Sequence, residues 1–441
     1  MSENLKQALN LSEMIKIKTI NHVAPDETDW EAFDAFKRLL ETMYPFVHKQ
    51  CERTFHDKTG ILYKWPGKSN NSQSTVLMAH YDVVPADASL WSVDPFGGEI
   101  NDGYIWGRGT LDTKETLCSI FEAAENLISE GFIPENDLYF SFSGDEEIGG
   151  PGAPAIVEYL NSKNIHPTLV IDEGGAIIDG NLFGLNKPIA AVGIGEKGYM
   201  DLELSLSGHG GHSSFPPPHS LLGNMSDSIM KLEKRPLSAR LTPPTREFLK
   251  VIGENSHGIK RVLFTQLWLS WPIIKYIFTN KGGKMNALIR TTTAVTKMTG
   301  SDAFNVMPPK VTAGINFRLL DGDTTQSVID HTLSATSNKD IEYKIIKSWE
   351  ASKIASTNHE GWHRVKSVIS DNWASIIVAP SMILGGTDSR HFDLVSDCVI
   401  KFTPVNMTEE QISSIHGHDE RISLSQLAEC VGFYKRIISV S

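Results

Sequence analysis

Apolar residues recur along the chain with two alternating spacings, one typical of helices and one typical of strands. Between the helical segments lie short apolar runs. The run at 74–85 is largely apolar until His80, as in a central strand covered on both faces, and the run at 138–143 is apolar and rich in aromatic residues, as in a buried strand. Alternating strands and helices predict an α/β domain with a mixed, mostly parallel sheet and helices on both faces. The predicted helices are 11–20, 30–43, 113–131 and 154–162, and the predicted strands are 61–65, 74–85, 138–143 and 168–175.

The pattern changes at Tyr199, where YMDLELSLSG alternates polar and apolar residues, as in a sheet with one wet face. Further elements follow in the order β-α-β-β-α-β, which predicts an inserted ferredoxin-like lid. The predicted parts are the first part of the α/β domain (1–195), the lid (196–350) and the second part of the α/β domain (351–441). The later elements are helices at 220–234, 325–337 and 423–438, with strands at 291–299, 311–320, 341–347, 375–384 and 399–404.

An insertion at about 236–289 interrupts the predicted lid and is rich in Trp, Phe, Leu and Ile. It has two interpretations. The first is ordinary helical packing inside the lid or at a subunit contact, and general burial of apolar patches favours it. The second is an apolar wall for a bulky or lipid-like substrate group.

Composition narrows the class of protein. At 441 residues the chain has room for two or three domains, and its net charge of −12 argues against nucleic-acid binding, which needs a basic face. Four dispersed cysteines favour buried thiols in a reducing compartment. The start of the chain carries frequent charges unlike a signal peptide, and the longest charge-free apolar stretch, 262–274, is too short to span a bilayer. These features predict a cytoplasmic protein with no membrane span.

Acids and histidines stand at the ends of the predicted strands. His80 and Asp82 are two residues apart on one strand, so both side chains point the same way, and Asp82 can hold the second ring nitrogen of His80. Asp145, Glu146 and Glu147 close the strand at 138–143, which alone could be a solvated acidic turn. The carboxyl ends of such strands form the ligand-binding edge of a sheet, so one site is expected. Its candidate residues are His80, Asp82, Asp112, Glu146, Glu147, Asp172, Glu173 and His391.

Nitrogen and oxygen ligands without cysteine suit Zn²⁺, with Mn²⁺ or Co²⁺ as substitutes. A carboxylate shared between two ions is the usual two-metal arrangement, and a further acid is then needed to take a proton from water. Adjacent glutamates can divide these two duties, because successive side chains at a strand end diverge.

Seven motifs carry a family resemblance that covers nearly the whole chain. In order they are HYDVVP, GRGTLDTK, SGDEEIGG, VIDEG, GHGGHSSFPP, FNVMPP and GGTDSRHF. Together they resemble the di-zinc metallopeptidase and amidohydrolase family of glutamate carboxypeptidase, aminoacylase and succinyl-diaminopimelate desuccinylase. NALIRTTTAVT and the apolar insertion before it look like the branch of carboxypeptidase S and the N-fatty-acyl-amino-acid synthase/hydrolase.

The resemblance implies a role for each matching residue. Two zinc ions per subunit would share Asp112, and Glu146 would be the general acid/base. The Asp112–Thr113 bond is expected to be cis, and the chain departs from the common family pattern at Thr113 and Glu115. The other implied roles are His80 as a ligand of one zinc with Asp82 supporting it, Glu147 and His391 as ligands of the other zinc, and Asp172, preferred to Glu173, as the fifth ligand.

Three lid residues also match the family. His212 resembles a histidine, often from the other subunit, that stabilises an oxyanion, and Arg318 matches an arginine that pairs with a substrate carboxylate. Asn305 is a further candidate for substrate contact. The expected protein is therefore a zinc hydrolase of N-acyl amino acids or small peptides with a free carboxylate, and the resemblance allows a homodimer. The alternatives are a dipeptidase or carboxypeptidase and, from another class, a non-catalytic metal-dependent binding protein.

Overall fold

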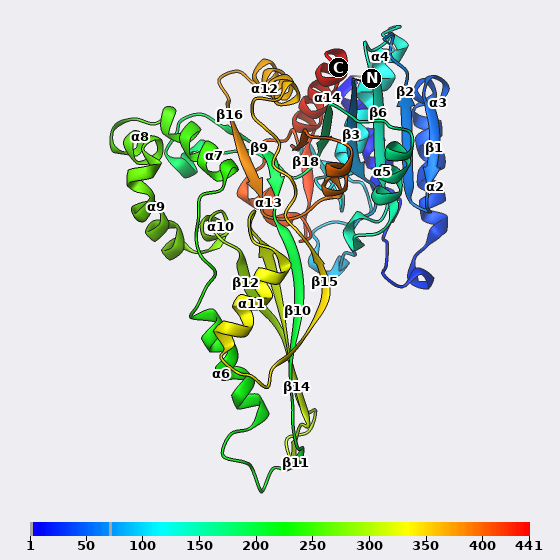
Figure 1. Ribbon diagram of the computed structural model, residues 1–441. Helices are drawn as coiled ribbons and strands as arrows, with labels where there is room; N and C mark the ends of the chain where they lie inside the picture. Colours follow the sequence, from blue (N-terminus) through cyan, green and yellow to red (C-terminus); the bar gives the residue numbers. More distant parts are fainter. Residues whose placement is uncertain (1–2, 70–72) are drawn as a thin grey trace. The chain divides into compact units, whose positions relative to one another are not determined.

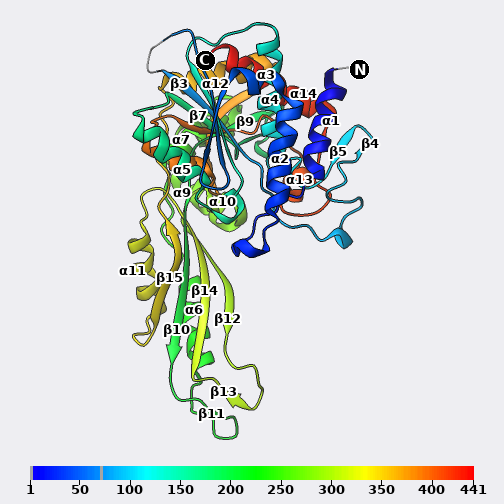
Figure 2. The same ribbon diagram turned by 90° about the vertical axis from the view of Figure 1, so that its right-hand side faces the viewer.

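The computed structural model describes residues 3–69 and 73–441, and the chain forms two compact units (Figures 1 and 2). Unit 1 comprises Met1–Ile194, Lys353–Ser381 and Thr387–Ser441. Unit 2 comprises Gly195–Ser352 and the short segment Met382–Gly386. The chain therefore leaves unit 1, builds most of unit 2 and returns.

Unit 1 is built on a sheet whose strands run in the order β1-β2-β6-β3-β7-β17-β9-β16, with β8 paired to β9. In its centre, β3 pairs in parallel with β6 and β7, and β7 pairs in parallel with β17. This confirms the predicted mixed, mostly parallel central sheet, and the structure places the parallel pairs in the centre. The strands are β1 (Glu52–His56), β2 (Gly60–Trp65), β3 (Ser74–His80), β6 (Asp137–Ser143), β7 (Leu169–Asp172), β8 (Ala176–Ile178), β9 (Ile189–Glu196), β16 (Ile377–Ile383) and β17 (Val399–Lys401).

Helices cover both faces of this sheet, because its central strands are apolar on both sides. Leu77 and Ala79 of β3 belong to the larger core, whereas Val76 and Met78 face a second core with α5 and the short η5 helix. The helices of unit 1 are α1 (Glu3–Lys16), α2 (Trp30–Met43), α3 (Pro45–Gln50), α4 (Lys114–Ser129), α5 (Gly152–Ser162), α12 (Glu360–Asn372), α13 (Glu409–Ser414) and α14 (Leu424–Ser439), with the 3-10 helices η3 (Glu146–Ile148) and η5 (Asp388–Leu394).

The parallel register brings the acid-bearing strand ends to one edge. His80 at the end of β3 lies opposite Ser143 at the end of β6, and Glu146 follows three residues later. On the other side of β3, β7 ends at Asp172. A small separate sheet pairs β4 (Ile100–Asn101), β5 (Tyr104–Trp106) and β18 (Arg421–Ser423), so it joins a segment before Asp112 to the C-terminal part of the chain.

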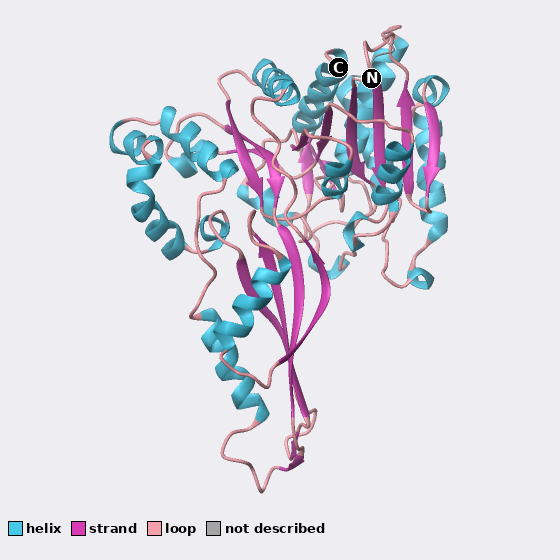
Figure 3. Cartoon of the chain, in the orientation of Figure 1, coloured by secondary structure: helices cyan, strands magenta, loops and turns pink. Residues whose placement is uncertain are grey.

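Unit 2 contains a four-stranded antiparallel sheet in the order β12-β14-β10-β15. Alternate residues of β14 are buried, and they pack with α6 and α11 on one face (Figure 3). The chain order β10-α6-β12-β14-α11-β15 and this strand order have the ferredoxin-like topology. The elements are β10 (Gly198–Ser207), α6 (Leu221–Glu233), β12 (Thr292–Thr299), β14 (Lys310–Leu319), α11 (Thr325–Thr336) and β15 (Glu342–Trp349).

The insertion between α6 and β12 is helical. Its elements are α7 (Pro243–Glu254), α8 (Gly258–Thr265), α9 (Leu267–Lys281) and α10 (Gly283–Ala287). A two-stranded ribbon pairs β11 (Gly211–His212) with β13 (Val306–Met307). It lies at the end of the unit 2 sheet where β10 ends and β14 begins.

Candidate metal centre

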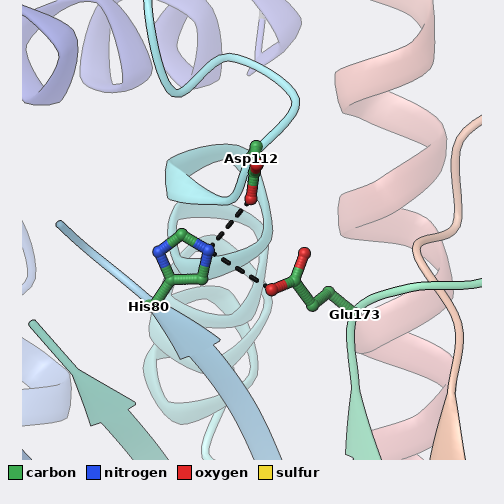
Figure 4. A group of neighbouring side chains, drawn as sticks. All are labelled: His80, Asp112 and Glu173. Carbon is green, nitrogen blue, oxygen red and sulfur yellow. Dashed lines mark hydrogen bonds and ion pairs between the residues drawn. The ribbon is translucent and has the colours of Figure 1, made fainter. Parts of the chain in front are cut away.

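His80 brings the first group of candidate ligands together at the end of β3. Its Nε2 atom lies 2.9 Å from Asp112 Oδ1 and 3.3 Å from Glu173 Oε1 (Figure 4). The side chain of His80 is only 2% exposed. Asp112 belongs to the loop before α4, and Glu173 directly follows β7. One histidine nitrogen and two carboxylates therefore converge on one point.

The second group shares Asp112 with the first. Nε2 of His416 lies 2.9 Å from Asp112 Oδ2 and 3.1 Å from Glu147 Oε2. Asp112 thus directs Oδ1 toward His80 and Oδ2 toward His416, so its carboxylate stands between the two groups. Within each group, one ligand atom per residue lies within 4.8 Å of the others.

The electrostatics of both groups favour a cation. Burial raises the pKa of Glu173 to about 8, and the nearby Asp112 adds to that rise. Burial also opposes ionisation of Asp112, yet hydrogen bonds from His416 and His80 hold its pKa below the usual range. Glu147 Oε1 is buried without a hydrogen-bond partner among the described residues. Acids packed this closely need positive charge, and the donor set of imidazole nitrogens and carboxylate oxygens suits a divalent ion such as Zn²⁺.

Asp82 orients both His80 and the two adjacent glutamates. It is fully buried, and its carboxylate accepts hydrogen bonds from the backbone N–H groups of Glu146 at 3.2 Å and Glu147 at 3.1 Å. Its Oδ1 also lies 3.4 Å from Nδ1 of His80. The Asp82 carboxylate therefore connects the end of β3 with the turn after β6.

Glu146 lies beside the candidate ligands but belongs to neither group. It is the first residue of η3. Burial raises its pKa well above the usual range; the charge on His80 opposes that rise, and the neighbouring acids, including Asp388 and Glu173, add to it. A carboxylate that readily takes a proton fits general acid/base chemistry.

Thr113 fixes the backbone of His80. Its hydroxyl oxygen accepts a hydrogen bond from the His80 N–H and donates one to the His80 carbonyl, both at 3.1 Å. The Asp112–Thr113 bond is cis, as the resemblance implied. Thr113, where the chain departs from the common pattern, thus holds Asp112 against β3.

A buried ion pair joins the loops that carry Asp112 and His416. Nη1 of Arg108 lies 2.6 Å from Oε2 of Glu420, and both side chains are almost fully buried. Oε1 of Glu420 accepts hydrogen bonds from the N–H of Leu111 at 2.7 Å and of Gly109 at 3.1 Å, and Arg108 donates to the carbonyl of Gly417 at 2.7 Å. The pair therefore sets the spacing of the second group.

Replacing Glu420 with glutamine should destabilise the fold, because it leaves Arg108 buried with its charge uncompensated. We expect a loss of about 3–5 kcal/mol in the free energy of unfolding, measured by urea denaturation. Glu410→Gln is the matched control, since Glu410 pairs with Arg421 at 2.7 Å but is 71% exposed, and its loss should be under about 1 kcal/mol. Equal losses in the two variants would contradict a positioning role for the buried pair.

The position expected for His391 is taken by His416. His391 lies on η5 and belongs to neither group of candidate ligands, and its Nε2 is buried without a hydrogen-bond partner among the described residues. Burial, with Arg390 nearby, lowers the pKa of His391 to about 4. Sequence reasoning missed His416, although IHGHDE places two histidines and two acids just before the last helix, a signal similar to those used elsewhere.

The prediction preferred Asp172 to Glu173 as the fifth metal ligand, and the structure places these two acids differently. Asp172 is 3% exposed, and its Oδ2 accepts a hydrogen bond from the Ser389 N–H at 3.0 Å. Glu173 instead contacts His80. Asp172 therefore ties β7 to η5, and Glu173 is the residue that the structure brings to the ligand group.

A sequence model of the family described as peptidase family M20/M25/M40 matches residues 76–440. This range includes every residue of the two groups of candidate metal ligands.

The chain belongs to this peptidase family.

Several relatives match over nearly the whole chain. The probable carboxypeptidase S-like 2 of Dictyostelium discoideum is 35% identical over 442 residues, covering 99% of this chain and 85% of the relative. The N-fatty-acyl-amino acid synthase/hydrolase PM20D1 of Xenopus tropicalis is 33% identical over 437 residues, covering 98% of this chain and 85% of the relative. Membership in the M20 family makes the protein a metal-dependent hydrolase of the metallopeptidase and amidohydrolase class.

A solved structure supports the fold. The M20 family metallo-carboxypeptidase Sso-CP2 from Sulfolobus solfataricus aligns with a TM-score of 0.72 at 18% identity, covering 100% of this chain and 99% of that one. Within the part of the chain that the structure describes, no helix has the length and apolar character needed to cross a membrane.

The three predicted lid residues, the catalytic candidate His212 and the substrate-binding candidates Arg318 and Asn305, lie in unit 2. His212 forms part of β11, and its Nδ1 accepts a hydrogen bond from the Ser214 N–H at 3.1 Å. The carbonyl of Asn305 accepts one from Ser213 at 3.1 Å, so Asn305 and the His212 loop are neighbours. Arg318 lies near the other end of β14, with its guanidinium 4.7 Å from the centre of the Tyr199 ring.

Proposed function

We propose that this M20 protein hydrolyses an amide bond next to a free carboxylate, in N-acyl amino acids or small peptides, with two Zn²⁺ ions per subunit. Asp112 carries the proposal, because its two oxygens face separate histidine-carboxylate groups at 2.9 Å each. The geometry supports one ion at His80, Asp112 and Glu173 and the other at Asp112, Glu147 and His416. Mn²⁺ or Co²⁺ could substitute, since these ions accept similar ligands.

Glu146 is the residue best placed to move protons. Divalent ions at this site would acidify a water molecule and polarise the substrate carbonyl. Glu146 would take a proton from that water and pass it to the nitrogen of the leaving amine. Asp82 holds the backbone of Glu146 and Glu147, so the base and its neighbouring ligand keep a set spacing. Glu146 would thus transfer the proton, and Glu147 would help to hold the metal.

Arg318 and His212 cannot both reach one small substrate from the same copy of unit 2. The His212 loop follows Gly208, which is bonded to Pro309 just before β14, whereas Arg318 lies near the end of that strand. Arg318 is nine residues beyond Pro309, and this length of strand spans roughly 30 Å. We therefore assign Arg318 to the substrate carboxylate, with bidentate geometry. His212, with Asn305 beside it, would stabilise the oxyanion of a second copy's substrate.

The candidate substrates differ in the group attached to the nitrogen of the amino acid, which is a fatty acyl chain in one class and another amino acid in the other. The relatives suggest both classes, since one is named carboxypeptidase S-like and another N-fatty-acyl-amino acid synthase/hydrolase. The test compares hydrolysis of an N-lauroyl amino acid, the matching N-acetyl amino acid and a dipeptide, with metal content measured on the same sample. We expect kcat/KM to be highest for the N-lauroyl compound. A clear preference for the dipeptide would instead support the peptidase alternative.

Metal removal completes this experiment. Dialysis against a chelator should abolish hydrolysis of every compound, and two equivalents of Zn²⁺ should restore it. A protein that binds two ions yet cleaves none of the three compounds would contradict the proposed hydrolase activity and favour a binding role.

A further inference from the structure

Helices α8 and α9 belong to the insertion and are labelled in Figure 1. They expose apolar side chains on a face where water-soluble proteins usually place polar ones. The buried stripe of α9 consists of Leu267, Ser270, Ile274 and Phe278. Its opposite face is also apolar, with Trp268 81% and Tyr276 72% exposed. The packing of α9 within unit 2 therefore accounts for one stripe of the helix and leaves the other unexplained.

The exposed apolar residues gather along a groove between α8 and α9. Ile259, Val262, Leu269 and Ile273 line this groove, which has a volume of about 590 Å³. Each of these four side chains is more than half exposed. Contiguous apolar surface of this kind marks an interaction site, whereas isolated exposed apolar residues are ordinary.

The charged side chains of the two helices that form this groove are all basic, while the adjacent α7 ends in the exposed Glu254, whose carboxylate lies 3.9 Å from Nζ of Lys250. Residues 258–287 contain no acid, and their charged residues are Lys260, Arg261, Lys275, Lys281 and Lys284, all exposed, in a chain of net charge −12.

A second hollow, of about 570 Å³, lies on another side of α9. Trp268 and Trp271 line it together with Arg246 and Lys250 of α7. Basic side chains thus accompany the apolar face on both hollows.

We propose that the α8–α9 surface, defined as the exposed residues of 258–281 with Arg246 and Lys250, docks on a bilayer that contains anionic lipid. Trp268, Leu269 and Ile273 would enter the boundary between headgroups and acyl chains, where aromatic and apolar side chains are favoured. The lysines and arginines would contact lipid phosphates, each contributing attraction near the surface.

A second copy of the chain fits this surface less well. An isologous contact would place the same patch on both partners, so Lys260, Arg261 and Lys275 of one copy would face those of the other. Like charges brought together in this way oppose association. An anionic bilayer satisfies the apolar and the basic residues at the same time.

The 441-residue protein should be tested by co-sedimentation with vesicles of phosphatidylcholine alone and of phosphatidylcholine with phosphatidylserine. We expect binding to the anionic vesicles only, and weaker binding as salt is raised. The double variant Lys260→Gln with Lys275→Gln should lower the partition coefficient about 25-fold, since each basic residue contributes about fivefold. Leu269→Gln with Ile273→Gln should lower it at least about tenfold.

Matched controls remove similar groups from other surfaces. Lys339→Gln with Lys344→Gln removes two exposed lysines of unit 2, and Val440→Gln removes an apolar residue that is 53% exposed. Both should bind vesicles like the parent protein. Thermal unfolding and hydrolysis of an N-acetyl amino acid check that each variant folds. A failure of the docking proposal would leave that hydrolysis untouched, so the two proposals fail separately.

A second measurement, based on fluorescence quenching, tests the proposal even if a double variant does not fold. Phosphatidylserine vesicles with brominated acyl chains should quench the fluorescence of the parent protein, and the conservative variant Trp268→Phe should lose much of that quenching. Equal binding to neutral vesicles, or equal binding by the variants and the parent, would overturn the proposal. The proposal would also be overturned if the parent protein formed a dimer that the α8–α9 variants cannot form and did not bind anionic vesicles.

Discussion

Glu146→Gln should lower kcat by about 10²–10⁴-fold while the protein still binds two metal ions. Glutamine keeps the size of the side chain and the backbone N–H that Asp82 accepts, so the turn after β6 should be preserved. It cannot take a proton from water at neutral pH. The measurement is kcat on the best substrate of the panel, together with metal content by elemental analysis.

Glu158→Gln provides the control, because Glu158 is an exposed glutamate on α5. Its kcat should equal that of the parent protein. A Glu146→Gln enzyme with near-parental kcat and two bound ions would remove Glu146 from the proposed mechanism. Loss of metal in the same variant would indicate instead that Glu146 is a ligand.

Replacing His416 with alanine should reduce the metal content from two ions to one and lower kcat/KM by more than about 100-fold. His416 contacts both Asp112 and Glu147, so its loss leaves the second group with two carboxylates that repel each other. Changes to groups that merely support a ligand already cost 10–100-fold in metal affinity or activity, and a direct ligand should cost more.

His391→Ala is the matched variant, since the sequence motif GGTDSRHF pointed to His391 and the geometry points to His416. We expect it to keep both ions and most of the activity. The opposite pattern, with metal lost in His391→Ala and kept in His416→Ala, would restore the assignment made from the motif.

Several elements could be predicted because their signals are local. The apolar stripe at 30–43 matches α2 (Trp30–Met43), and the strand predicted at 74–85 begins with β3 but ends earlier, at His80. Helix α1 was predicted at 11–20 but covers Glu3–Lys16. Thr19 instead accepts a hydrogen bond from Val83 at 3.0 Å, and Ile20 forms a bridge with Val83. The chain therefore leaves the helix earlier than its periodicity indicated and contacts the distant segment that follows β3.

The candidate metal centre shows the same difference between local signals and distant contacts. His80, Glu146 and Glu147 follow directly from strand ends and adjacent acids, and the sequence by itself determined the fold class and the family through such short patterns. Only the tertiary structure brought Glu173 rather than Asp172 to His80, and His416 rather than His391 to Asp112. The loop that carries His416 is held beside the Asp112 loop by the buried contact between Arg108 and Glu420, which are 312 residues apart. Pairing over such distances leaves no periodicity in the chain, so the fold alone decides it.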